Sequence, residues 1–326
     1  MKNVTILVLN QGLLGSIEGP RLLFTEVNAY LERMGKEPLF NVQLAGCNPQ
    51  THLYNGLYAI QPNVLIQDID TTHLVIIPAM DGDIQTAIQA NQDFIPWIKK
   101  QYKAGAEVAS LCIGAFLLAA TGLVKGRQCA THWGAVNLFR KLYPDVHLVE
   151  DKIITDEQGI YSSGGAFSYL NLLLYLVEKY TGREIAILAA KAFQIDIERS
   201  SQSPFIIFHG QKDHDDEPVK KVQTFIEAHP HEKISVDQLA LLATLGRRNL
   251  ERRFKKATSN TIIEYIQRVK IEAAKKSFET SRENINEVMY SVGYADTKAF
   301  RTIFKKITGL SPVDYRNKYN REAMVV

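Results

Sequence analysis

The sequence has only three cysteines among its 326 residues, and no two of them lie close together. Cys47, Cys112 and Cys129 are too few and too widely spaced for a disulfide framework. The same spacing argues against a zinc site, which needs paired ligands a few residues apart. We therefore expect no metal and no cofactor.

Long hydrophobic runs are also missing. No stretch approaches the roughly 18 uninterrupted apolar residues of a membrane span. The first residues, MKNVTILVLNQGLLG, carry one lysine and lack the small-residue cleavage pattern of a signal peptide. We therefore expect a cytoplasmic protein that does not associate with membranes. Its length suits two or three domains.

Positive and negative charges are distributed unevenly along the chain. Residues 1–217 hold 17 Lys and Arg against 23 Asp and Glu, a net charge of −6. Residues 218–326 hold 21 against 12, a net charge of +9, and the two values sum to the +3 of the whole chain. We therefore expect the two parts to have different kinds of partner, with the basic part as the candidate for nucleic acid. On charge alone, a solvated basic surface is an equally good interpretation.

The hydrophobic pattern changes at the same place. Up to about residue 195, short β-branched runs such as VTILVLN and THLVIIPAM alternate with helical periods, which predicts a flavodoxin-like α/β domain with a mostly parallel sheet and helices on both faces. Residues 196–217 contain HGQKDHDDEP and are predicted to be a linker. Residues 218–320 have helical periods throughout and are predicted to form an all-α domain.

The all-α part contains a repeat. FKKATSNTIIEY begins at Phe254 and FKKITGLSPVDY at Phe304, an offset of 50 residues. The offset extends backward without a gap, so that Leu239 aligns with Met289 and Leu250 with Phe300. Each copy reads as a short helix, a turn and a basic second helix, which is the helix-turn-helix pattern. We place the two units at about residues 235–258 and 285–308.

The second helix of each unit has the geometry to enter the major groove of DNA while the first helix braces it. One long helix, residues 261–278, would hold the two units about one turn of DNA apart, roughly 34 Å. Lys255, Lys256, Lys305 and Lys306 lie late in these helices and suit phosphate contacts. The exposed residues predicted to contact double-stranded DNA are Arg247, Arg248, Asn249, Glu251, Arg252, Thr297, Lys298, Arg301 and Thr302.

Residues 218–319 resemble the DNA-binding domain of the AraC family of bacterial transcription regulators, most closely in INEVMYSVGYADTKAFRTIFKKITGLSPVDYR. The resemblance implies seven helices, two helix-turn-helix units and a function in transcription, with RNA polymerase as a candidate partner. The family often has Phe-x-Arg-x-Phe in its second recognition helix. This chain has Thr302 at the arginine position and Arg301 one residue earlier, a rotation of about 100° around the helix.

The α/β part has one chemically suggestive segment, AEVASLCIGAFLLAATG. A strand that ends at Cys112, followed by a helix from about Gly114, resembles a nucleophile elbow. The helix N-terminus would lower the thiol pKa, His132 could act as a base, and Glu18 could reach the same sheet edge. Alternatively, Cys112 is a small buried hydrophobe and His132 a structural residue beside Trp133.

Residues 3–195 resemble the class I glutamine amidotransferase-like, PfpI-like domain that occurs fused to AraC-type DNA-binding domains. SLCIGAFLLAATGLVKGRQCATHW and YSSGGAFSYLNLLLYLVEKYTG carry the resemblance. Hydrolytic relatives often have histidine directly after the cysteine, where this chain has Ile113. The resemblance therefore implies a sensor that binds a small-molecule effector and biases dimerisation. The candidate ligand-binding residues are Glu18, Cys112, Ile113 and His132.

Three functions remain open from the sequence. A ligand-responsive, homodimeric transcription regulator accounts for both parts of the chain. A cysteine-dependent amide or peptide hydrolase would use Cys112 and His132, with DNA binding secondary. A nucleoid-type DNA binder would have no effector.

Overall fold

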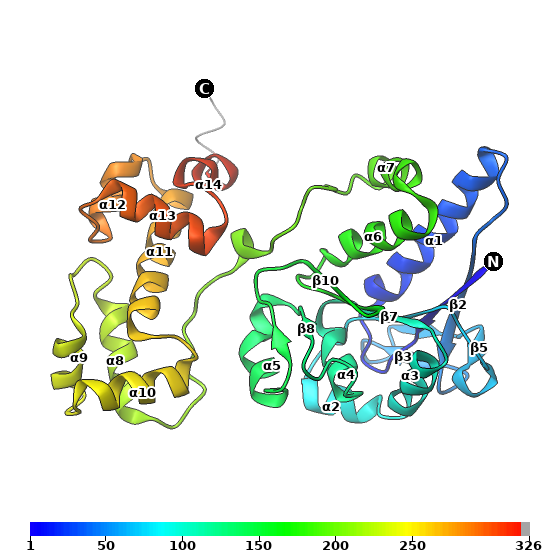
Figure 1. Ribbon diagram of the computed structural model, residues 1–326, viewed down its shortest axis with the longest axis horizontal. Helices are drawn as coiled ribbons and strands as arrows, with labels where there is room; N and C mark the ends of the chain where they lie inside the picture. Colours follow the sequence, from blue (N-terminus) through cyan, green and yellow to red (C-terminus); the bar gives the residue numbers. More distant parts are fainter. Residues whose placement is uncertain (321–326) are drawn as a thin grey trace. The chain divides into compact units, whose positions relative to one another are not determined.

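The computed structural model describes residues 1–320 and divides the chain into two compact units. The first unit ends at Gln202 and the second begins at Ser203 (Figure 1). Among the described residues, none of the helices combines the length and the apolar character that crossing a membrane requires.

A seven-stranded sheet forms the centre of the first unit. Its strand order is β10-β11-β7-β6-β1-β2-β5, and every neighbouring pair is parallel except β10 with β11. This confirms the predicted mostly parallel α/β fold. The strands are β1 (Lys2–Leu7), β2 (Phe40–Gly46), β5 (Val64–Leu65), β6 (Leu74–Ile77), β7 (Glu107–Ser110), β10 (Ile154–Glu157) and β11 (Ile160–Ser163).

Helices cover both faces of this sheet, because successive strand residues point to opposite sides. In β6, Leu74 and Ile76 belong to one apolar cluster, and Val75 and Ile77 belong to the other. The first cluster lies under α1 (Leu14–Arg33), α6 (Tyr169–Thr181) and α7 (Arg183–Ala192). The second lies under α2 (Ile84–Ala90), α3 (Phe94–Lys103), α4 (Ala115–Ala120) and α5 (Val136–Leu142).

Two short two-stranded sheets complete the first unit. One is the hairpin of β3 (Thr51–Leu53) and β4 (Tyr58–Ile60). The other pairs β8 (Gln128–Cys129) with β9 (His147–Leu148) in parallel. The β8 pair brings the segment after it, which includes His132, toward the end of β11, since the Ala130 amide donates to Ser162 Oγ at 2.6 Å.

The second unit is helical, as predicted. Two apolar clusters form its interior, and the longest helix, α11, contributes to both: Tyr265 and Val269 to one, Ile271 and Phe278 to the other. The helices are α8 (Glu217–Ala228), α9 (Val236–Leu242), α10 (Arg247–Thr258), α11 (Ile262–Thr280), α12 (Ile285–Ser291), α13 (Thr297–Thr308) and α14 (Pro312–Tyr319).

The segment that follows the junction is held on the second unit. Lys275 Nζ donates to the Ile206 carbonyl at 2.6 Å, and the Phe208 amide donates to Glu272 Oε2 at 3.2 Å. The Tyr319 hydroxyl donates to the carbonyl of Pro204 at 3.1 Å. Residues 204–208, which fall in the predicted linker, therefore lie against α11 and α14.

Candidate functional site

The first helix-turn-helix unit consists of α9 and α10. Ser235 begins α9 with a capping box, in which its hydroxyl accepts from the Gln238 amide and the Gln238 side chain accepts from the Ser235 amide. Leu250 and Phe254 of α10 are fully buried. Their i, i+4 spacing fixes one face of α10 inward and leaves the opposite face toward solvent.

All five DNA-contact candidates of α10 are exposed. Arg247 pairs with Glu251 at 3.2 Å and with Asp237 at 3.4 Å, whereas Arg252 donates to Asn249 Oδ1 at 3.2 Å. Arg248 makes no hydrogen bond or ion pair with any residue between 1 and 320. The exposed surface of α10 thus presents one unpaired guanidinium group and two that are held by weak, solvent-exposed contacts.

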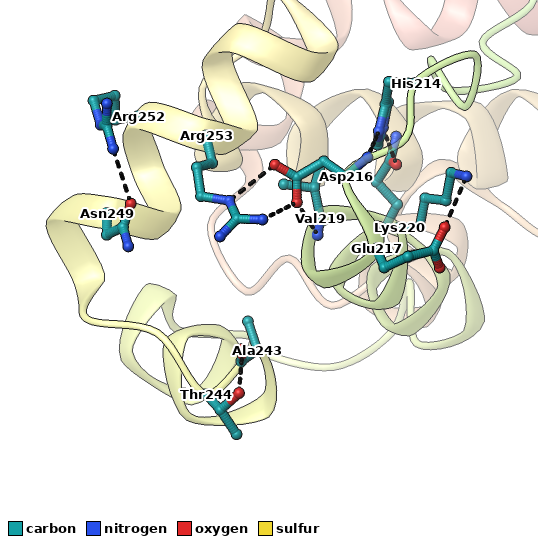
Figure 2. Close-up of polar contacts among 11 residues, drawn as sticks. His214, Asp216, Glu217, Val219, Lys220, Ala243, Thr244, Asn249, Arg252 and Arg253 are labelled. Atoms are coloured by element: carbon teal, nitrogen blue, oxygen red, sulfur yellow. Dashed lines mark hydrogen bonds and ion pairs between the residues drawn. The ribbon is translucent and has the colours of Figure 1, made fainter.

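Not every arginine of α10 faces outward. Arg253 forms a bidentate pair with Asp216, with Nε and Nη2 at 2.9 and 2.8 Å from the two carboxylate oxygens (Figure 2). Asp216 also caps α8 by accepting from the Val219 amide at 3.2 Å. The Arg253 guanidinium lowers the pKa of the Asp216 carboxyl through these hydrogen bonds. Arg253 therefore holds α10 on α8 and is not a DNA-contact candidate.

The second helix-turn-helix unit consists of α12 and α13. Asn284 begins α12 with a capping box to Glu287, and Asp296 begins α13 by accepting from the Ala299 amide at 2.6 Å. The Lys298, Arg301 and Thr302 side chains are exposed and Thr297 is half-buried. None of these four side chains has a hydrogen-bond or ion-pair partner among residues 1–320, so all of them are available to a ligand such as DNA.

The two copies of the repeat have the same internal contacts. Thr258 Oγ1 donates to the Phe254 carbonyl at 2.8 Å, and Thr308 Oγ1 donates to the Phe304 carbonyl at 2.9 Å. Tyr265 and Tyr315 each pack edge-on against the preceding phenylalanine, with ring centroids 5.2 and 5.4 Å apart. Each tyrosine hydroxyl also donates to a glutamate, Glu227 in one copy and Glu279 in the other.

The gapless extension of the repeat is wrong before α10 and α13. The caps Ser235 and Asn284 are 49 residues apart, whereas the buried pair Leu250 and Phe300 is 50 apart. The turn between α9 and α10 spans residues 243–246, and the turn between α12 and α13 spans 292–296. The first turn is thus one residue shorter, and the sequence concealed this because Leu, Val and Met are interchangeable at buried helix positions.

The shorter turn places a threonine in a left-handed conformation. Thr244 has φ +54°, and the glycine at the structurally equivalent position, Gly293, has φ +74°. A β-branched residue in this region costs about 1–2 kcal/mol. Its side chain is exposed and donates only to the adjacent Ala243 carbonyl (Figure 2).

Replacing Thr244 by glycine is therefore expected to stabilise the helical compact unit that begins at Ser203 by about 1 kcal/mol. The measurement is the urea midpoint of the transition that belongs to this unit. Thr224→Gly is the matched control, because Thr224 is also exposed but lies inside α8, where glycine should destabilise the helix by roughly a few tenths of a kcal/mol relative to threonine. Equal destabilisation by both changes would contradict strain at Thr244.

The candidate site of the first unit lies after β7. Cys112 has φ +52°, the strained backbone of a sharp strand-to-helix turn. Gly114 makes this turn possible, since a Cβ there would lie 2.4 Å from the Pro78 carbonyl oxygen. The Cys112 amide donates to Ser163 Oγ at 3.2 Å, and Thr131 Oγ1 donates to the Cys112 carbonyl at 3.1 Å. The predicted elbow is therefore present and is held from both sides.

The side chains of Cys112, His132 and Glu18, which were proposed to act together in catalysis, are not hydrogen-bonded to one another in the part of the chain that the structure describes. Glu18 accepts two hydrogen bonds from Arg21, at 2.5 and 2.6 Å. His132 Nδ1 accepts from the Gly134 amide at 3.1 Å, and burial lowers its pKa. Between residues 1 and 320, no hydrogen bond or ion pair links Cys112 to Glu18 or to His132. The half-buried Ile113 follows Cys112 at the turn.

Burial has a larger effect on the thiol pKa of Cys112 than the helix N-terminus has. The residue is 3% exposed, and desolvation raises the pKa of its thiol to about 11, although the Ile113 amide acts in the opposite direction. The expectation of a lowered thiol pKa was therefore wrong. A group with this pKa is almost entirely protonated at neutral pH, whereas a cysteine nucleophile requires the thiolate.

Cys112 is accordingly expected to react slowly with iodoacetamide in the folded protein at pH 7. With the pKa raised above neutrality, the thiolate fraction is about 10⁻⁴ and increases roughly tenfold for each pH unit up to the pKa. The measurement is the alkylation rate of the Cys112 peptide by mass spectrometry between pH 7 and 10, with the urea-unfolded protein as control. Labelling at pH 7 that is faster in the folded protein would contradict the assignment.

Sequence reasoning missed the supports of the elbow and their connection to the end of the unit. Ser163 and Thr131 bind the backbone of Cys112, and the side chain of Gln202 donates to the Thr131 carbonyl at 3.0 Å. Gln202 is fully buried and is the last residue of the first unit. Only the pair Ser162-Ser163 before two glycines signalled a polar sheet edge in the sequence.

Comparison with known proteins agrees with this division. Residues 239–318 match a helix-turn-helix domain family, and residues 26–179 match the DJ-1/PfpI family. The regulator GbdR of Pseudomonas aeruginosa is 23% identical over 255 residues, which is 73% of this chain and 66% of GbdR. The regulator GlxA of Rhizobium meliloti is 20% identical, over 68% of each chain. Both are HTH-type transcriptional regulators.

Solved structures support the fold of the first unit. A protein from Vibrio parahaemolyticus, crystallised as a candidate transcriptional regulator, matches with a TM-score of 0.53 and 22% identity, over 59% of this chain and 98% of that protein. A THiJ/PfpI family protein from Pseudomonas syringae matches with a TM-score of 0.50 and 14% identity, over 82% and 89% of the two chains.

The match to GbdR covers 73% of the 326 residues, about 238, which is more than the 202 residues of the first compact unit. It therefore includes residues of both compact units. The relatives named as regulators are therefore similar to this chain across both units. The chain combines an AraC-type helix-turn-helix domain with an N-terminal domain of the DJ-1/PfpI family, and its relatives are HTH-type transcriptional regulators.

Proposed function

We propose that the protein is a sequence-specific DNA-binding transcription regulator whose activity is controlled by a small molecule bound to the first unit. The observation that carries the proposal is the pair of helix-turn-helix units with equivalent contacts, each with exposed polar and basic side chains on its second helix. Helix α10 holds six Lys and Arg and one Glu, and α13 holds four Lys and Arg and no carboxylate.

The proposed DNA contacts follow from exposure and position. Arg248, Arg252 and Arg301 suit base edges, because arginine binds guanine in bidentate fashion. The late lysines of α10 and α13 suit phosphates. In the first helix-turn-helix unit, a groove of about 600 Å³ is lined by four basic residues of α10, Arg248, Arg252, Lys255 and Lys256, together with Glu251 and apolar residues of α9 and α11.

The proposed effector site is the edge of the sheet at Cys112, since open parallel sheets bind ligands beyond the carboxyl ends of their strands. The hydrogen bonds from Cys112 through Thr131 to Gln202 connect this edge to the end of the unit. A ligand that displaced the elbow would therefore act on the residue next to the DNA-binding unit. Homodimerisation and contact with RNA polymerase belong to the same proposal.

The hydrolase alternative is disfavoured by the site. The Cys112 thiol is buried with a raised pKa, and His132 and Glu18 bind other groups. The relatives named as regulators point in the same direction.

Selection of genomic fragments by the purified full-length protein, with and without metabolites, tests the proposal. We expect enrichment of one sequence, with an affinity that decreases steeply with salt. A thermal-shift screen of metabolites then identifies the effector, and footprinting shows whether it alters binding. Fragment recovery without sequence preference under every condition would reject the proposed function.

A further inference from the structure

Lys270 lies on α11 at the point where this helix passes from one apolar cluster to the other. The preceding residue, Val269, packs in the cluster of the first helix-turn-helix unit, and the following residue, Ile271, packs in that of the second. A lysine at such a position is unusual because its side chain is only 7% exposed.

The ammonium group of Lys270 binds one backbone carbonyl from each side. Its Nζ atom donates to the Glu232 carbonyl, in the connection between α8 and α9, at 2.9 Å. It also donates to the Val292 carbonyl, in the turn between α12 and α13, at 2.9 Å. The same atom lies 5.8 Å from the ring centroid of Tyr294. Lys270 therefore joins the α8–α9 connection, which leads into the first helix-turn-helix unit, to the turn inside the second helix-turn-helix unit, across the middle of α11.

The surroundings of Lys270 allow little adjustment. A Cβ at Gly293 would lie 2.4 Å from the His231 carbonyl oxygen and 2.6 Å from Lys270 Nζ, so the two chain segments and the ammonium group are in close contact. Removing the ammonium group would leave two carbonyls without their donor in a largely buried place. Apart from α11, the apolar clusters of the two helix-turn-helix units are separate. The polar contact of Lys270 therefore acts together with α11 in fixing the orientation of these two units.

We propose that Lys270 is a positioning residue that sets the distance and angle between α10 and α13, and thereby the spacing of the two DNA subsites that the protein accepts. The proposal rests on the proposed function, since it concerns how the two units bind one DNA site. Lys270 does not itself contact DNA in this account, because its ammonium group is occupied inside the domain.

The test compares two DNA probes: the site selected by the wild-type protein, and the same site with one base pair inserted between its subsites. One base pair moves the second subsite by about 3.4 Å and rotates it by about 35°. We expect the insertion to weaken wild-type binding at least tenfold. In Lys270→Met the selected site should bind more weakly, and the ratio of the two affinities should decrease severalfold. Lys276→Met, which removes an exposed lysine from the same helix, should keep the wild-type ratio.

The ratio separates positioning from stability, because a partly unfolded preparation lowers the affinity for both probes equally. If Lys270→Met does not yield folded protein, Lys270→Gln, which keeps a hydrogen-bond donor but removes the charge and shortens the side chain, should relax the ratio likewise. An unchanged ratio in the variants, or a wild-type protein that tolerates the insertion, would overturn the role of Lys270. Absence of any selected site would instead reject the proposed function, and the Lys270 proposal with it.

Discussion

Replacing Phe304 by alanine is expected to destabilise the second helix-turn-helix unit by about 3–5 kcal/mol, the usual cost of removing a fully buried phenylalanine. Phe304 is 0% exposed. Its ring centroid lies 5.6 Å from that of Phe278, 5.7 Å from that of Phe300 and 5.4 Å from that of Tyr315. These contacts join α13 to α11 and α14, so the cavity would open where three helices meet.

The measurement is hydrogen exchange of peptides from the full-length protein, because two compact units do not unfold as one two-state transition. We expect protection to decrease in residues 285–319 and to stay unchanged in residues 1–202. Val313→Ala is the control, since Val313 is 48% exposed and its truncation should change stability by less than about 0.5 kcal/mol. Protection that decreased equally in both units would contradict a separate core around Phe304.

Replacing Arg252 by alanine is expected to weaken binding to the selected DNA site by about 1–3 kcal/mol, or roughly 5- to 150-fold, and to relax the preference at one base position. The Arg252 side chain is exposed and its single contact, with Asn249, is easily exchanged for a base edge. Binding to a selected site and to its single-base variants measures both effects.

Lys255→Ala is the matched comparison from the same helix. Lys255 is exposed near the end of α10, where a phosphate contact is expected. Its loss should weaken binding evenly across sequences and lower the slope of log affinity against log salt by about 1. If both variants behaved like the wild type, α10 would not be a DNA-contacting helix. If Arg252→Ala only changed the salt slope, its assignment to a base would be wrong.

The architecture could be predicted because it depends on periodic patterns. The alternation of apolar strands with helices predicted the parallel sheet, and the repeat predicted both helix-turn-helix units. Both patterns are local in sequence and reinforce each other over many residues. The cap residue Ser235 also belongs to this class, since a cap depends on its own sequence neighbours.

What could not be predicted depends on contacts between distant residues. The raised pKa of Cys112 results from burial under elements far along the chain. Glu18 is different, because its partner Arg21 is only three residues away on α1 and such a pair is local in sequence. The left-handed Thr244 is similar to Cys112, because tertiary packing of α9 and α10 imposes a conformation that threonine itself disfavours. Arg253 lies in the basic run of α10, and its pairing depends on Asp216, a residue 37 positions earlier in the chain.

The turn before α10 has four residues and the turn before α13 has five, so the two helix-turn-helix units are not exact copies of one another. The first residues of α10 and α13 also differ, Arg247 and Arg248 in one and Thr297 and Lys298 in the other. If the two subsites of the proposed DNA site were exchanged, α10 and α13 would each meet bases that their side chains do not match. On the proposed DNA site a single chain would therefore bind in one direction only, and inverting the site would present each subsite to the wrong recognition helix.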